Sequence, residues 1–161
     1  STLDGKTRIL TAQEELQRAI SALPDDGWFN VIFYNDQVRP WRQGLVPATA
    51  DNRFAALQKI FSIDPERRTA LNDALEVAVD FGNQPGSRNA PEQVEQVLLL
   101  SDGKPTAGRI VSSAEIVMNI TNRNVLRRIR IDTLGIDSDD SPEQLLLDLA
   151  RNNFGKYYKL R

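Results

Sequence analysis

The chain has 161 residues, in which Lys+Arg 20 against Asp+Glu 22 leave a formal net charge of −2. This length fits a single domain with a sizeable core, and the near-neutral charge gives no field that would favour nucleic acid or an anionic membrane as a partner. The chain holds no cysteine and no histidine, which excludes disulfides, thiolate and imidazole metal sites, and histidine-dependent catalytic triads. Because the apolar runs are too short to span a bilayer, we expect no membrane insertion by this segment and no nucleic-acid binding.

Helix-like and strand-like patterns alternate through the first half of the chain. Apolar residues at spacings of three and four predict an amphipathic helix over about residues 7 to 23, ending before Pro24. An aromatic and β-branched run predicts a strand from Trp28 to Tyr34. Residues 37–42 follow as a short strand at the sheet edge, where Pro40 costs no interior hydrogen bond. Two further helical faces are expected: one from Phe54 to Phe61 and one that begins near Thr69 and reaches Phe81.

The second half of the chain continues this alternation. Residues 82–89 are rich in Gly, Asn and Pro and predict a surface loop, followed by a buried strand over about residues 96–100. Ser112 and Glu115 have the spacing of a capping box and predict a helix that ends near Asn122. The remaining elements are a strand from Arg128 to Ile136, a helix that starts at Ser141-Pro142-Glu143-Gln144 and ends at Asn153 and Gly155, and a short strand from Tyr157 to Leu160.

The uncharged run Val97-Leu98-Leu99-Leu100 ends abruptly in Ser101-Asp102-Gly103. A continuous apolar run of this kind is typical of a parallel strand that is buried on both faces. Because the carboxyl ends of such strands form the ligand crevice of an open α/β sheet, Asp102 would be placed for a hard cation or a polar partner. The alternative interpretation is that Ser101 and Asp102 cap a turn or a following helix.

A helix followed by strands that alternate with helices predicts an α/β fold: a doubly wound, mostly parallel sheet flanked by helices, with one short antiparallel edge strand and its opening strand missing. Several segments, in their order and spacing, resemble a von Willebrand factor type A (vWA) domain, of the bacterial type rather than the integrin inserted type. They are Phe29-Asn30-Val31-Ile32-Phe33-Tyr34-Asn35, Thr69-Ala70-Leu71-Asn72-Asp73-Ala74-Leu75, Leu99-Leu100-Ser101-Asp102-Gly103-Lys104-Pro105-Thr106, Ile131-Asp132-Thr133-Leu134-Gly135-Ile136, and Leu149-Ala150 through Gly155-Lys156-Tyr157-Tyr158.

The resemblance implies a metal-ion-dependent adhesion site (MIDAS). In this family the site is built from an Asp-x-Ser-x-Ser loop, a threonine at the opening of a later helix and the aspartate that ends the fourth strand. Thr69 matches the threonine, Asp102 matches the aspartate, and Ser1 stands at the position of the last serine of the loop. The implied cofactor is Mg²⁺, or Mn²⁺ or Ca²⁺, which prefers oxygen ligands. The implied function is metal-dependent binding of a carboxylate on a protein partner, by a module that is often associated with the cell envelope and is not an enzyme.

The first strand of the family and most of the Asp-x-Ser-x-Ser loop have no counterpart in this sequence. That strand would occupy the middle of the sheet, where its loss would leave neighbouring strands with unpaired backbone groups, each costing about 1–3 kcal/mol. We therefore expect residues 1–161 to form a single vWA-like domain that is an excerpt of a longer protein, with a metal site that this chain alone does not complete.

Three alternatives stay open from the sequence. Thr69 could act only as a helix N-cap, a position that threonine favours. Asp102 together with another acid could serve a metal-assisted α/β hydrolase. The domain could also be a scaffold whose metal site is incomplete.

Three other charged motifs give weaker indications of a binding site. Asp137-Ser138-Asp139-Asp140 lacks the spacing and the glycine of an EF-hand loop, and Gly103-Lys104-Pro105-Thr106 lacks the glycine and the ending of a phosphate loop. A local basic cluster lacks the interleaved aromatic residues of a nucleic-acid groove and is interpreted as the exposed edge of a strand. Its members are Arg123, Arg127, Arg128 and Arg130.

Overall fold

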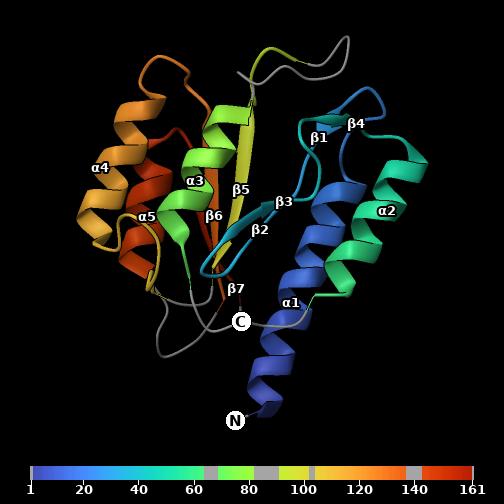
Figure 1. Ribbon diagram of the computed structural model, residues 1–161, viewed down its shortest axis with the longest axis horizontal. Coiled ribbons are helices and arrows are strands. Elements are labelled where there is room, and N and C mark those ends of the chain that lie inside the picture. The colour runs from blue at the N-terminus through green and yellow to red at the C-terminus, as the bar shows by residue number, and fades with distance from the viewer. Residues whose placement is uncertain (1, 64–68, 82–90, 102–103, 137–142, 161) are drawn as a thin grey trace.

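The computed structural model describes residues 2–63, 69–81, 91–101, 104–136 and 143–160, which form five helices and seven strands (Figure 1). In chain order these are α1 (Thr2–Ser21), β1 (Trp28–Phe29), β2 (Ile32–Tyr34), β3 (Val38–Pro40), β4 (Val46–Pro47), α2 (Ala50–Phe61), α3 (Leu71–Asp80), β5 (Gln96–Ser101), α4 (Ser113–Asn124), β6 (Arg130–Ile136), α5 (Glu143–Asn152) and β7 (Tyr157–Leu160).

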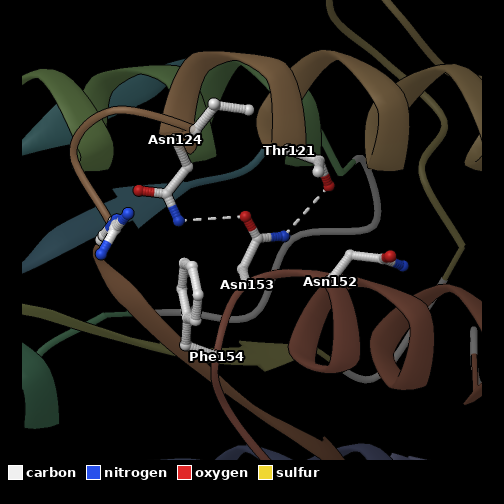
Figure 2. Close-up of a pocket in the computed structure, with 7 residues that line it drawn as sticks. Thr121, Asn124, Asn152, Asn153 and Phe154 are labelled. Carbon is white, nitrogen blue, oxygen red and sulfur yellow. Dashed lines mark hydrogen bonds between the residues drawn. The ribbon is translucent and has the colours of Figure 1, made fainter.

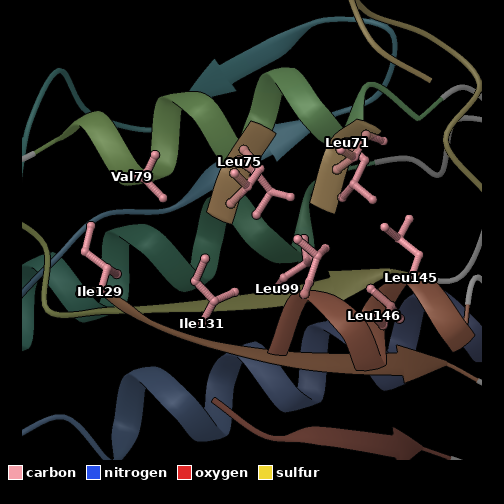
Figure 3. Packing of buried hydrophobic residues seen from close by; sticks show 11 residues of the cluster. Leu71, Leu75, Val79, Leu99, Ile129, Ile131, Leu145 and Leu146 are labelled. Atoms are coloured by element: carbon pink, nitrogen blue, oxygen red, sulfur yellow. The ribbon is translucent and has the colours of Figure 1, made fainter. Parts of the chain in front are cut away.

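A parallel sheet lies at the centre of the fold, with β6 between β5 and β7. The register places Leu99 of β5 opposite Thr133 of β6, and Thr133 opposite Tyr157 of β7. Helices α3, α4 and α5 cover one face of this sheet, and α1 lies against the other face with α2 beside it (Figures 1 and 3). The predicted doubly wound, mostly parallel α/β fold is confirmed.

The strand predicted from Trp28 to Tyr34 is divided into two pieces. The side-chain oxygen of Asn30 accepts hydrogen bonds from the backbone N–H groups of Val31 (2.8 Å) and Arg42 (3.1 Å), and these replace regular ladder bonds between strands. As a result β1 pairs with β4, which the sequence did not predict, while β2 pairs with β3. The expected antiparallel edge strand with its proline is β3, so that part of the prediction is confirmed.

Two separate clusters of buried apolar side chains hold the helices in place. The larger cluster joins α3, α4 and α5 to β5 and β6, and Figure 3 shows its side chains converging between the helices and the sheet. Its members Leu71, Ile131 and Leu146 are fully buried, as expected of a sheet covered by helices. The smaller cluster lies under α1 and α2 and contains Ile20, Phe29, Val31, Ala48, Ala56 and Ile60.

Several element boundaries differ from those expected. Helix α1 begins at Thr2 rather than near residue 7, and α3 begins at Leu71 rather than near Thr69. Ser112 is the N-cap of α4, but its side chain makes no capping hydrogen bond, so the predicted capping box is wrong. The loop expected over residues 82–89 and the helix start expected at Ser141-Pro142 lie outside the described residues. Within the described ranges, no helix has the length and apolar character needed to cross a membrane.

Helix α5 ends in a turn that the sequence predicted only in outline. The N–H groups of Asn153 and Gly155 both donate to the carbonyl of Ala150, at 3.1 and 2.9 Å, and the left-handed position between them is taken by Phe154, with φ 63°. Gly155 is required for a steric reason. A Cβ at this position would lie 1.8 Å from the carbonyl oxygen of Ile131. Glycine at this position lets the chain pass directly against β6.

Candidate functional site

Of the three predicted metal ligands, the structure describes Thr69, whereas Ser1 and Asp102 lie outside the described residues. Three backbone contacts place Thr69. Its N–H donates to the side-chain oxygen of Thr106 at 3.0 Å, and its carbonyl accepts from the N–H groups of Thr106 and Ala107 at 3.0 and 3.2 Å. Because Thr106 follows β5 by a few residues, Thr69 lies beside the loop that leaves the carboxyl end of β5.

The end of β2 reaches the same place. The N–H of Ala70 donates to the carbonyl of Asn35 at 2.5 Å, and the hydroxyl of Tyr34 donates to the carbonyl of Leu100 at 2.8 Å. The start of α3, the end of β2 and the end of β5 therefore meet at one edge of the molecule. This is the ligand edge expected for an open α/β sheet.

The hydroxyl of Thr69 is not used to begin the helix. Ala70 is the N-cap of α3, and this cap has no side-chain hydrogen bond among the described residues. The interpretation of Thr69 as a simple N-cap is therefore wrong. Among the described residues, the Thr69 side-chain oxygen makes no hydrogen bond, although both backbone polar groups of Thr69 are bonded.

A second set of contacts attaches the loop that carries Thr106 to α3. The N–H of Arg109 donates to both carboxylate oxygens of Asp73, at 3.2 and 3.3 Å. Gly108 permits this contact: its φ is +95°, and a Cβ there would lie 2.8 Å from Asp73 Oδ2. The Arg109 guanidinium then forms an ion pair with Glu76, one turn further along the helix.

Glu76 is the centre of a polar network between α3 and α4 that the sequence analysis did not identify. Its carboxylate accepts from Asn119 Nδ2 at 2.8 Å and from Asn72 Nδ2 at 3.2 Å, and it pairs with Arg123 at 3.2 Å. Burial raises the pKa of Glu76, but the hydrogen bonds from Asn119, Arg109 and Asn72 and the charge of Arg123 outweigh this, so its pKa lies below the usual value. The sequence pattern that could have revealed this network is the four-residue spacing of its polar residues, from Asn72 to Glu76 on α3 and from Asn119 to Arg123 on α4.

The basic cluster of the sequence is largely neutralised in the fold. Arg123 and Arg127 pair with Asp80 of α3, at 3.5 and 2.5 Å. Arg130 pairs with the buried Asp132 at 3.0 Å. Three of the four arginines in the cluster therefore have acidic partners within the fold, and the absence of nucleic-acid binding stays a prediction.

A hollow of about 400 Å³ lies at the opposite end of the sheet, between the C-terminal ends of α4 and α5 (Figure 2). Its buried amides are fully engaged. Asn124 Nδ2 donates to the Asn153 side-chain oxygen at 3.0 Å and to the Ile129 carbonyl at 2.7 Å, while Asn153 Nδ2 donates to the Thr121 hydroxyl at 3.2 Å. Because their hydrogen-bonding capacity is used within the protein, these groups join helices to β6 rather than offer a binding site.

The donor set at the carboxyl edge suits a hard divalent cation. Within the described residues no three His, Cys, Asp or Glu side chains gather as a metal cluster. The hydroxyl of Thr69 is an oxygen donor of the kind that Mg²⁺ accepts beside one or two carboxylates and water molecules. The sequence places Asp102, which lies outside the described residues, directly after Ser101, the last residue of β5, so the predicted donors are a hydroxyl and a carboxylate, both of the kind that such an ion accepts.

Comparison with known proteins identifies the family. A family model described as von Willebrand factor type A domain matches residues 5–159, and the chain belongs to this family. It is similar to inter-alpha-trypsin inhibitor heavy chain H2 of Mus musculus, with 32% identity over 128 residues that make up 78% of this chain and 13% of that protein. It is also similar to heavy chain H4 of Homo sapiens, with 32% identity over 148 residues, 88% of this chain and 16% of that protein. The chain thus spans only a small part of these relatives.

Solved structures agree on the fold. A von Willebrand factor type A protein from Catenulispora acidiphila matches with a TM-score of 0.78 and 21% identity, over 95% of this chain and 34% of that one. Proximal thread matrix protein 1 from the mussel byssus, with a zinc-occupied MIDAS motif, matches with a TM-score of 0.68 and 14% identity, over 99% of this chain and 40% of that one. At these identities the likeness concerns the fold alone.

Proposed function

We propose that this domain is a metal-ion-dependent protein-interaction module, which binds a carboxylate of a protein partner through Mg²⁺ at the carboxyl ends of its strands. The observation that carries the proposal is the placement of Thr69: its backbone is fixed beside the loop leaving β5, and its hydroxyl has no bond among the described residues. Membership of the vWA family and the zinc-occupied MIDAS motif of a protein with the same fold support it.

In this proposal Thr69 ligates through Oγ1, Asp102 contributes its carboxylate, and Ser1 contributes its hydroxyl. When bound, the cation supplies an open coordination position that a carboxylate of the partner enters. Mn²⁺ or Ca²⁺ would serve in place of Mg²⁺ with the same oxygen donors. The role of the protein is to hold these oxygens at the exposed edge of the sheet.

We further propose that the domain is not an enzyme. The two acids of α3 near this edge are already engaged, Asp73 by the N–H of Arg109 and Glu76 by side chains of α4. A metal-assisted hydrolase would need an additional acid that is free to act on substrate or water. The inter-alpha-trypsin inhibitor heavy chains to which this chain is similar also support an interaction role, in an extracytoplasmic or envelope-associated setting.

The domain is also proposed to be part of a longer protein. Among the described strands β5 pairs only with β6, and its other edge receives the hydroxyl of Tyr34 at Leu100 rather than a strand. A further strand between β2 and β5 would satisfy that edge. We also expect the partner of the domain to be a protein ligand, with no nucleic acid involved.

Calorimetric titration of Mg²⁺ and Mn²⁺ into the longer protein that carries residues 1–161 tests the proposal. We expect saturable binding that Asp102→Ala abolishes and that Asp51→Ala, an exposed acid in the first turn of α2, leaves unchanged. Equal metal binding by the unmodified protein and the Asp102→Ala variant would remove the metal hypothesis. A protein that binds its partner equally well with and without metal would be a scaffold with an incomplete site.

A further inference from the structure

The loop of residues 104–109 and the start of α3 form a closed ring of contacts. At one end of the loop, Thr106 and Ala107 exchange three hydrogen bonds with the backbone of Thr69, at 3.0, 3.0 and 3.2 Å. At the other end, Arg109 is bonded to Asp73 through its N–H. Because Thr69 leads directly into α3 and Asp73 lies in its first turn, both ends of the loop are attached to the same short stretch of chain.

The ring is fixed at its far end by charge and by steric fit. Asp73 is an acid at a helix N-terminus, where the helix dipole stabilises it, and its carboxylate accepts a charge-assisted bond from the Arg109 N–H. Gly108 has the positive φ that the tight approach requires, with no room for a Cβ against Asp73. The Arg109 guanidinium adds the ion pair to Glu76. The loop is therefore held to α3 independently of Thr106.

The side chain of Thr106 closes the near end of the ring. Its oxygen is the acceptor for the N–H of Thr69, and no other side chain of the described residues bonds to that N–H. Thr106 is exposed, and Thr69 is only partly buried. Solvent can replace a lost hydrogen bond at such a position, so removal of the Thr106 hydroxyl is expected to change the orientation of Thr69 more than the stability of the fold.

We propose, on the basis of the metal site described under the proposed function, that Thr106 is a positioning residue for that site. Its side-chain oxygen, fixed to α3 through Arg109 and Asp73, holds the backbone of Thr69 so that the Thr69 hydroxyl stays directed toward the cation. Thr106 and Arg109 are thereby both attached to the start of α3. Groups that orient a metal ligand in this way typically contribute 10–100-fold to metal affinity.

The test compares Thr106→Val with Thr106→Ser in the longer protein that carries residues 1–161. Valine keeps the shape of threonine but removes the acceptor, whereas serine keeps the acceptor. Mn²⁺ affinity is measured by electron paramagnetic resonance, thermal unfolding gives the stability, and amide hydrogen exchange reports on the N–H of Thr69. We expect Thr106→Val to weaken Mn²⁺ binding about 10-fold or more and to speed exchange at Thr69, with serine close to the unmodified protein.

A second variant tests the far end of the ring. Asp73→Ala removes the acceptor for the Arg109 N–H and is expected to weaken Mn²⁺ binding in the same direction as Thr106→Val. Valine and serine variants of equal affinity would overturn the positioning role while leaving the metal site intact. If the unmodified protein binds no Mn²⁺, the proposed function and the positioning role both fail. A drop in thermal stability shared by valine and serine, with affinity unchanged, would assign Thr106 to the fold alone.

Discussion

The two ends of the parallel sheet use polar side chains in opposite ways. At the amino end, Asn124 and Asn153 are buried and bonded to each other and to the backbone around β6. At the carboxyl end, the polar groups of the Thr69 backbone are bonded, but its hydroxyl has no partner among the described residues. The hydrogen-bonded side chains at the amino end hold the fold together, whereas the metal site that we propose at the carboxyl end would use the Thr69 hydroxyl.

Because of this difference, we expect mutations at the two ends of the sheet to affect two different properties, stability and ligand binding. Changes at the amino end should reduce the free energy of unfolding, because they leave buried polar groups unpaired or force atoms together. Changes to the hydroxyl at the carboxyl end should affect ligand binding with little effect on stability.

The largest effect is expected for Gly155→Ala. The added Cβ would lie 1.8 Å from the Ile131 carbonyl oxygen, so the connection between α5 and β7 must move away from β6. We expect a loss of more than about 4 kcal/mol in the free energy of unfolding, or failure to fold, measured by urea denaturation. Gly135→Ala is the graded control, since its Cβ would meet the Tyr157 hydroxyl at 3.0 Å, a group at the end of a side chain. Equal losses in both variants would contradict this reasoning.

Asn124→Ala is expected to have the next largest effect. The change removes the acceptor for the Ile129 N–H and the donor to the Ile129 carbonyl and to Asn153. Leaving these buried groups unpaired should cost about 3 kcal/mol. Asn152→Ala is the matched control, because its amide is exposed and, among the described residues, bonds only to the Asp148 carbonyl. If both substitutions cost the same, the amide network is not a structural element.

A smaller effect is expected from the pH dependence of stability. Because the pKa of Glu76 is lowered in the folded state, its ionised form stabilises the fold above the unfolded-state value near 4.5, and this contribution is lost as the pH falls through the lower folded-state pKa. Urea denaturation from pH 6 to pH 2 should therefore show a loss of stability that is shallower in Glu76→Gln. Identical pH profiles would mean that the Asn119 and arginine contacts do not favour the ionised carboxylate.

The smallest effect on stability is expected for Thr69→Val. The substitution keeps the shape of the side chain and removes a hydroxyl that has no bond among the described residues. The free energy of unfolding should change by less than about 0.5 kcal/mol, whereas Mg²⁺ affinity should fall by at least about tenfold, since the proposed function makes this hydroxyl a direct ligand. A large loss of stability would show that the Thr69 hydroxyl belongs to the fold.

The sequence predicted the fold well where one physical pattern dominates. The apolar run ending at Ser101 and the alternation of helices with strands determined the parallel sheet, because burial on both faces leaves few other solutions. It failed where a side chain competes with the backbone. Asn30 divided one strand by bonding to Val31 and Arg42, and that local hydrogen bonding is invisible to propensity.

The site was predicted less completely than the fold. The resemblance implied Thr69 as a ligand, and the structure places its backbone beside the loop after β5, but its role as a ligand stays a prediction. The contacts that hold it there, through Thr106 and Asp73, depend on residues 37 and 36 positions apart in the chain. Such long-range contacts arise from the tertiary arrangement of α3 against the loop, so periodicity and motif spacing in one sequence do not reveal them.

Paramagnetic broadening by Mn²⁺ in NMR spectra of the longer protein that carries residues 1–161 tests the contrast between the two ends directly. The amide signals of Thr69, Ser101 and Thr106 should broaden at substoichiometric Mn²⁺, while those of Asn124 and Asn153 stay sharp, and Asp102→Ala should remove the effect. Broadening centred on the asparagines, or no localised broadening in the unmodified protein, would contradict a metal site at the carboxyl end of the sheet.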